Sequence, residues 1–163
     1  MDRKETGMRM RTVLLLAALA AGIVGVAIAA SEPAKPPKGN QIMWGDVKEG
    51  AKFAQKNKLP MMMHFTANWC GWCKKLEKEV YVVPEVIKLS QNFVCAKVDF
   101  DKEKELVKQY GMKGIPTIIF TNSKGEEVHR IGGYMPADSF IEEMNKALKK
   151  LEENKETDKK GAK

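Results

Sequence analysis

Apolar positions along the chain follow two spacings, one typical of strands and one typical of helices. Near-continuous or alternating apolar runs predict strands at residues 61–66, 93–100, 117–121 and 127–131. Apolar residues that recur every three or four positions predict helices at residues 46–56, 71–81, 84–90, 103–110 and 136–151. Because helices alternate with most of these strands, the pattern predicts an α/β fold, a central mixed β-sheet flanked by helices.

The strand Met61–Thr66 is expected to lie at the centre of the sheet. Its residues are almost all apolar, which is typical of a strand that is covered on both faces. Short signals mark the ends of other elements: Asp46 suits a helix N-cap, and Gly111 suits the residue after a helix. The charged residues from Glu152 onward are expected to fray. We therefore predict a folded domain over residues 44–151 and a charged tail over residues 152–163.

The N-terminal part of the chain carries a targeting signal. Residues 13–30 are an unbroken apolar run, Arg9 and Arg11 precede it, and Ala27-Ile28-Ala29 offers a cleavage pattern of small residues. These features predict that residues 1–30 are a secretory signal peptide, or an N-terminal membrane anchor if they are not cleaved. Residues 31–43 then form a Pro- and Lys-rich linker. The domain is expected in the periplasm or another extracytoplasmic space, free or tethered to the inner membrane by residues 13–30.

Charge and cysteine content narrow the class of protein. The formal net charge is +7, but acidic residues are interspersed, and the lysines at the C-terminus are interpreted as a solubilising tail. The sequence contains no nucleic-acid-binding motif, and nucleic acid is not an expected partner. Its three cysteines are too few for a disulfide-stapled scaffold, so the apolar core must hold the fold.

Two of these cysteines form a pair with a spacing suited to redox chemistry. Cys70 and Cys73 stand at the junction between the strand at 61–66 and the following helix. A helix N-terminus favours an anion, so Cys70 is expected to form a thiolate and attack, while Cys73 resolves the mixed disulfide. A zinc site is the alternative. No second pair with metal-ligand spacing exists among Cys95, His64 and His129, so the redox interpretation is favoured and no metal ligand is assigned.

A second motif, Gly114-Ile115-Pro116-Thr117, follows the cysteine pair by about forty residues. Together the two motifs resemble the thioredoxin superfamily over roughly Trp44–Leu151, most closely its bacterial thiol:disulfide interchange domains. The resemblance implies a thioredoxin-like fold with a cis peptide bond before Pro116 and a substrate strand paired to the backbone of Ile115. It also implies that Trp69 shields the nucleophile. Trp72 stands between the cysteines where small thioredoxins have proline, and it is expected to project toward substrate.

Three further residues, His64, Lys97 and Cys95, lie outside the two motifs. His64 occupies the position at which many thioredoxins have a buried acid, and Lys97 matches a lysine that lies near that acid. His64, with Lys97, is either a proton relay for Cys73 or a neutral, hydrogen-bonded histidine buried in the core. Cys95 is expected to be a small buried hydrophobic residue without a redox role.

The favoured function is reduction of protein disulfides by an exported thiol–disulfide oxidoreductase. Its expected partners are proteins with cysteines or disulfides and a membrane protein that resupplies electrons, and the two thiols need no cofactor. Three alternatives remain open: a disulfide oxidase or isomerase, which would use the same atoms, a Cu(I)-binding metallochaperone-like module, and a non-catalytic adaptor that binds beside Pro116.

Overall fold

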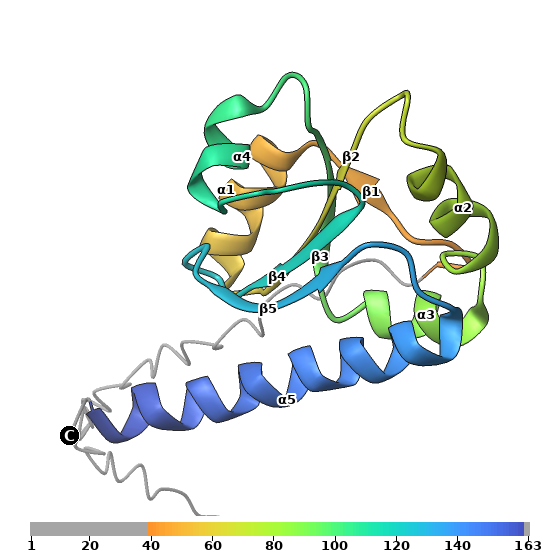
Figure 1. Ribbon diagram of the computed structural model, residues 1–163. Coiled ribbons are helices and arrows are strands. Elements are labelled where there is room, and N and C mark those ends of the chain that lie inside the picture. Colours follow the sequence, from red (N-terminus) through yellow and green to blue (C-terminus); the bar gives the residue numbers. More distant parts are fainter. Residues whose placement is uncertain (1–38, 162–163) are drawn as a thin grey trace, which may run out of the picture. The chain divides into compact units, whose positions relative to one another are not determined.

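A computed structural model describes residues 39–161 as five strands and five helices (Figure 1). The strands are β1 (Trp44–Gly45), β2 (Met61–Thr66), β3 (Val94–Asp99), β4 (Thr117–Thr121) and β5 (Glu127–Gly132). The helices are α1 (Val47–Asn57), α2 (Gly71–Glu79), α3 (Pro84–Ser90), α4 (Lys104–Gln109) and α5 (Ala137–Gly161). The predicted strands and helices are therefore all present, and β1 is an addition to them.

The strands form one mixed sheet in the order β1-β3-β2-β4-β5. Strand β3 runs parallel to both β1 and β2, while β4 is antiparallel to β2 and β5 is antiparallel to β4. Helices α2, α3 and α5 cover one face of the sheet, and α1 and α4 cover the other (Figure 1). This arrangement confirms the predicted mixed sheet flanked by helices.

The central position of β2 explains its apolar sequence, because both of its faces are buried. Met61, Met63 and Phe65 pack in the cluster that includes residues of α1. Met62 points the other way, into the cluster formed with α2, α3 and α5. Because successive side chains of a strand alternate between its faces, His64 lies on the same face as Met62, beneath the helices that follow Cys70.

One edge of the sheet collects the loops that matter for chemistry. The register pairs Phe65 of β2 with Thr117 of β4, and Thr117 with Gly132 of β5. It also pairs Thr66 with Asp99 at the end of β3. The loops that carry the cysteine pair, the Gly-Ile-Pro segment and the residues after β3 and β5 therefore all emerge at the same edge.

The folded domain extends beyond both predicted limits. Ile42, placed in the linker by the sequence, is buried in the core. Helix α5 continues to Gly161, past the predicted helix end at Leu151 and through most of the predicted charged tail. The segment contains several Glu and Lys residues, which are good helix formers, and it continues a helix already fixed by its packed first turns.

The signal peptide or anchor predicted for residues 1–30, and the linker up to residue 38, lie outside the described residues. No helix within residues 39–161 is both long enough and apolar enough to span a membrane.

Candidate active site

The cysteine pair forms a disulfide at the N-terminus of α2. Cys70 is the N-cap of this nine-residue helix, and its sulfur accepts a hydrogen bond from the backbone N–H of Cys73 over 3.1 Å. The two Cα atoms are 5.3 Å apart. The exposed fraction is 4% for Cys70 and 1% for Cys73. A backbone N–H and the positive end of the helix thus converge on Cys70, which is an arrangement that stabilises a thiolate there.

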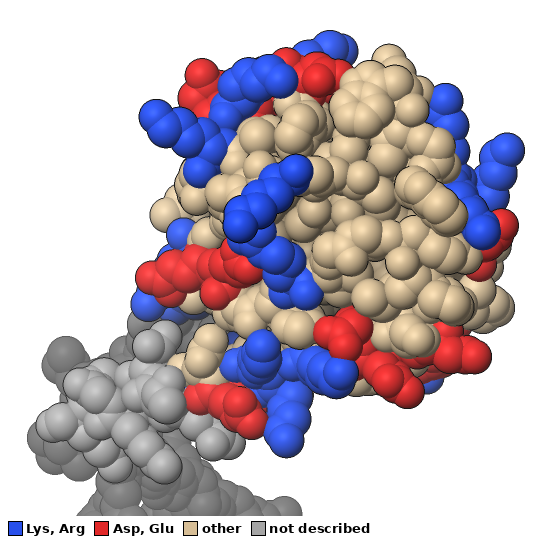
Figure 2. Space-filling model, viewed as in Figure 1, with Lys and Arg blue, Asp and Glu red and all other residues tan. Residues whose placement is uncertain are grey.

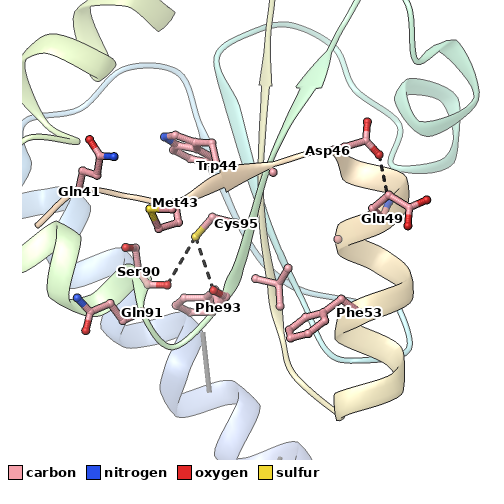
Figure 3. Close-up of a pocket in the computed structure, with 13 residues that line it drawn as sticks. Gln41, Met43, Trp44, Asp46, Glu49, Phe53, Ser90, Gln91, Phe93 and Cys95 are labelled. Atoms are coloured by element: carbon pink, nitrogen blue, oxygen red, sulfur yellow. Dashed lines mark hydrogen bonds between the residues drawn. The ribbon is translucent and has the colours of Figure 1, made fainter. Parts of the chain in front are cut away.

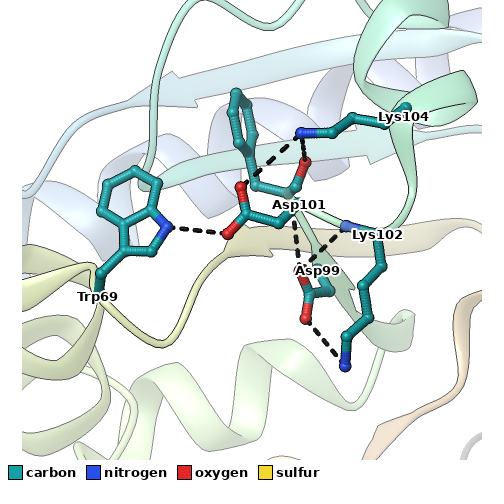
Figure 4. A network of polar contacts seen from close by, with 6 residues as sticks. Trp69, Asp99, Asp101, Lys102 and Lys104 are labelled. Atoms are coloured by element: carbon teal, nitrogen blue, oxygen red, sulfur yellow. Dashed lines mark hydrogen bonds and ion pairs between the residues drawn. The ribbon is translucent and has the colours of Figure 1, made fainter.

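Trp69, just before the pair, is held in place by a network of polar side chains (Figure 4). Its indole nitrogen donates to the Asp101 carboxylate over 2.8 Å, although the side chain is 66% exposed. Asp101 also forms an ion pair with Lys104. Behind it, Asp99 accepts hydrogen bonds from the backbone N–H groups of Asp101 and Lys102, and these bonds lower the pKa of Asp99.

Trp72, between the two cysteines, is 58% exposed and contacts an aromatic residue from a distant loop. Its ring centroid lies 5.4 Å from that of Tyr134, in the loop that follows β5. The ammonium group of Lys75 lies 5.3 Å from the Trp72 ring and 4.7 Å from the Tyr134 ring. The Tyr134 hydroxyl donates to the Glu79 carboxylate over 2.7 Å. The exposed indole predicted from the sequence is therefore present and is fixed by neighbours that the sequence did not indicate.

The Gly-Ile-Pro segment borders an open groove at the same edge of the sheet. The Ile115–Pro116 peptide bond is cis, as the resemblance implied. The Pro116 carbonyl accepts the N–H of Gly133 over 2.8 Å, which ties this segment to the loop after β5. The groove has a volume of about 560 Å³, and four of its lining residues are glycines, at positions 111, 114, 132 and 133. A polypeptide backbone could approach Ile115 closely here, because these residues carry no side chains.

His64 is completely buried and lies among aromatic side chains. Its ring centroid is 5.3 Å from that of Tyr81 and 5.9 Å from that of Trp44. Burial, with a smaller contribution from the positive charge of Lys97, lowers the pKa of His64 to about 3. A base with so low a pKa takes up a proton weakly near neutral pH. Neither ring nitrogen of His64 has a hydrogen-bond partner among the described residues, so the hydrogen bonds expected of a core histidine are not found.

Lys97 lies beside His64 in the sheet register but forms its ion pair with another element. Its ammonium group is 2.7 Å from the Glu77 carboxylate of α2 and 5.7 Å from the centroid of the Trp44 ring. The carboxylate partner of this lysine therefore comes from the helix that carries the cysteines. Sequence reasoning did not single out Glu77.

Cys95 is buried on β3, far along the sheet from the loop edge. Its thiol donates weakly to the carbonyl oxygens of Ser90 and Phe93, and burial raises its pKa to about 12. The thiol lies at the floor of a cavity of about 390 Å³ beside β1, between Met43 and Phe53 (Figure 3). A thiol that stays protonated is a poor nucleophile, in agreement with a small buried hydrophobic residue. Within the part of the chain that the structure describes, no three His, Cys, Asp or Glu side chains are grouped to hold a metal ion.

Comparisons with known proteins agree with this geometry. The family model for a thioredoxin-like domain matches residues 47–148. The chain is 32% identical over 92 residues to a thioredoxin-like protein, HCF164, of Arabidopsis thaliana chloroplasts, covering 56% of this chain and 35% of that protein. It is 31% identical over 102 residues to the thiol:disulfide interchange protein DsbD of Cronobacter sakazakii, covering 59% of this chain and 18% of DsbD.

Two solved structures share the fold. A thioredoxin from Thermus thermophilus superposes with a TM-score of 0.61 and 28% identity, covering 68% of this chain and 90% of the thioredoxin. The reduced C-terminal domain of Neisseria meningitidis DsbD superposes with a TM-score of 0.56 and 27% identity, covering 64% of this chain and 99% of that domain. The chain thus spans a small part of the two curated relatives but nearly the whole of these two single domains.

Proposed function

The chain belongs to the thioredoxin-like family of thiol–disulfide oxidoreductases, and from this premise we propose that it is an exported reductase of protein disulfides. The observation that carries the proposal is the placement of Cys70. Its sulfur caps α2 and accepts the N–H of Cys73, and that second thiol is close enough to close a disulfide with it. This is the arrangement required of an attacking and a resolving thiol.

The proposed reaction passes two electrons from the cysteine pair to the substrate. The Cys70 thiolate attacks one sulfur of a substrate disulfide, that S–S bond breaks, and the departing sulfur takes up a proton. The Cys73 thiol, on losing its proton, then attacks the Cys70 sulfur of the mixed disulfide. The second substrate thiol leaves, and Cys70 and Cys73 are joined in a disulfide. The substrate has been reduced and the pair oxidised.

The groove beside Pro116 is the proposed binding site for the substrate segment. An extended chain there could pair with the backbone of Ile115 in the manner of an added strand. Trp69 and Trp72 flank the entrance to the cysteine pair, and their exposed rings offer apolar contact area. Protein disulfides in extended or loosened segments are therefore the proposed substrates.

The oxidised pair must be reduced again after each turnover. We propose a dithiol partner in the membrane as the electron donor, because the signal predicted for residues 13–30 would carry the domain away from the reducing cytosol. N-terminal sequencing of the protein isolated from its native membrane and soluble fractions tests the signal. A mature chain that begins near residue 30 supports cleavage, while an intact N-terminus in the membrane fraction supports a tether.

A redox titration of the Cys70–Cys73 pair tests the proposed direction. Thioredoxin-type reductants have potentials near −270 mV, whereas strong oxidants lie near −120 mV. We expect a value close to the first, together with reduction of insulin by the protein in the presence of dithiothreitol. A value close to the second supports the oxidase alternative. Absence of any reversible two-electron couple overturns the oxidoreductase function, and stoichiometric Cu(I) on the anaerobically purified protein then supports the metallochaperone alternative.

A further inference from the structure

Building on the proposed function, we propose that Tyr134 is a specificity-determining residue, which joins Trp72 in an aromatic wall that selects substrates with an apolar side chain next to the reactive cysteine. The aromatic wall consists of Trp72 and Tyr134 with the two residues that hold them, Lys75 and Glu79. The proposal goes beyond the cysteine pair and the groove beside Pro116. It names the feature that the substrate must carry.

The wall joins two parts of the chain that are distant in sequence. The Trp72 and Tyr134 rings are 5.4 Å apart and inclined by 36°. The hydrogen bond from the Tyr134 hydroxyl to Glu79 spans 55 residues of sequence, and Lys75 approaches both rings as well as the Glu79 carboxylate, at 3.9 Å. Tyr134 is thereby fixed to the helix that carries the cysteines, so its ring is ordered before substrate arrives.

The position of the wall places it beside an incoming substrate. Trp72 stands between Cys70 and Cys73, and Tyr134 directly follows Gly133, whose N–H is bonded to the Pro116 carbonyl. A segment lying along Ile115 with its sulfur near Cys70 would therefore present its next side chains to these rings. On the face shown in Figure 2, residues other than Lys, Arg, Asp and Glu form most of the surface beside α2, so an incoming side chain would meet few charges there.

The charges in the wall favour an apolar group over an ionic one. Lys75 forms its ion pair with Glu79, so the cation is already compensated within the wall. An acidic side chain of a substrate would have to compete with Glu79 for Lys75. An apolar side chain gains contact with the 58% exposed Trp72 ring without competing for either charge. Because both rings are already fixed, covering them costs little conformational entropy.

Two disulfide peptides that differ at one position test the proposal. They are identical except for Leu or Ser beside the first cysteine, and the ratio of their kcat/KM values for the reduced protein is the readout. Partial burial of a leucine side chain is expected to give a preference of about tenfold for the Leu peptide. Tyr134→Ala should reduce the ratio to about twofold, since the wall loses one ring and its anchor. Phe53→Ala removes a partly exposed aromatic side chain from the cavity beside β1 and should retain the full ratio.

A Leu-to-Ser ratio of kcat/KM near one in the unmodified protein, or an unchanged ratio in Tyr134→Ala, overturns the proposal that the aromatic wall selects substrates. Equal loss on both peptides also overturns it, because a purely structural role of Tyr134 would lower both rates together. If Tyr134→Ala does not fold, Tyr134→Phe retains the ring, loses the bond to Glu79 and should give an intermediate ratio. Failure of the proposed function has a different signature: the unmodified protein then reduces neither peptide nor oxidised 2-mercaptoethanol.

Discussion

The two cysteines of the pair differ in their surroundings, and this difference predicts different behaviour. The Cys70 sulfur accepts a hydrogen bond from the backbone N–H of Cys73 and caps α2, while Cys73 lies within the first turn of that helix. We expect Cys73→Ser to accumulate mixed disulfides with substrate, because the attacking thiol remains and the resolving thiol is gone. Cys70→Ser should accumulate none. Non-reducing gels with a disulfide substrate measure this, with Cys95→Ser as a control that behaves like the unmodified protein. Equal trapping by both variants would reverse or abolish the assigned roles.

Burial of His64 is expected to make the free energy of unfolding depend on pH. Its pKa is about 3 in the folded protein, because of burial, but near 6.5 in an unfolded chain. Below pH 6.5 the unfolded chain therefore binds more protons, and the free energy of unfolding falls as the pH is lowered toward 3. Between pH 7 and pH 5 the loss from this one group is about 2 kcal/mol. Urea denaturation at the two pH values should show it in the unmodified protein and not in His64→Leu.

The other histidine supplies the control for this measurement. His129 is bonded to Glu143 near the surface, and His129→Gln should retain the loss assigned to His64. A His64→Leu variant with the full loss would contradict the assignment. The same variant also addresses the relay: if the rate of mixed-disulfide resolution in the folded fraction falls by about 100-fold or more, His64 acts in proton transfer after all.

At the scale of elements, the groove beside Pro116 stays open because glycines line it at the end of β5 and in the Gly-Ile-Pro segment. Gly132 has no positive φ, and a Cβ atom placed on it would meet no atom within 4 Å. The fold therefore tolerates a side chain here, whereas the groove does not. We expect Gly132→Val to keep its unfolding midpoint and to lower kcat/KM for a protein disulfide by about 10- to 100-fold. Gly45→Ala, on the opposite edge strand, should retain activity. Unchanged turnover in Gly132→Val would mean that substrates do not use this groove.

The elements that the sequence predicted are those whose burial leaves a long repeating pattern. Helix α5 is such a case up to Leu151, and β2 was predicted instead from its almost continuous apolar run, because both of its faces are buried. Strand β1 has two residues, too few to show a period. The extension of α5 beyond Leu151 has no apolar face to read, and only helix propensity supports it. A charged segment of this kind is equally typical of a frayed end.

Within the site, the sequence motifs identified the residues nearest the chemistry but not those that hold them. The cysteines, both tryptophans and the cis proline stand in short motifs with fixed spacing. Asp101 reaches Trp69 across 32 residues, and Tyr134 reaches Glu79 across 55. The fold brings such partners together from distant parts of the chain, so no short sequence motif identifies them. The burial of Cys95 was predictable because an alternating strand pattern already placed it in the core.

At the scale of the whole molecule, the redox state of the pair and the stability of the fold are linked. Reduction of Cys70–Cys73 and unfolding of the domain form a thermodynamic cycle. If folding makes the pair more reducing than it is in the unfolded chain, the oxidised protein must be the more stable form. Folding that makes it more oxidising stabilises the reduced form instead, as in strong oxidants. The proposed direction of electron transfer therefore predicts which redox form of the folded protein is the more stable.

For a reductase we expect the oxidised protein to melt at the higher temperature. A shift of 30 mV in the potential of the pair on folding corresponds to about 1.4 kcal/mol, and each 1 kcal/mol displaces the Tm of a domain of this size by about 2–8 °C. Calorimetric scans of the oxidised protein, and of the protein in excess dithiothreitol, measure the sign directly. A variant with both Cys70→Ser and Cys73→Ser should give the same Tm in the two solutions, since the buried Cys95 forms no disulfide. A higher Tm for the reduced protein would reject the reductase direction and favour a disulfide donor, with the same two cysteines transferring electrons the other way.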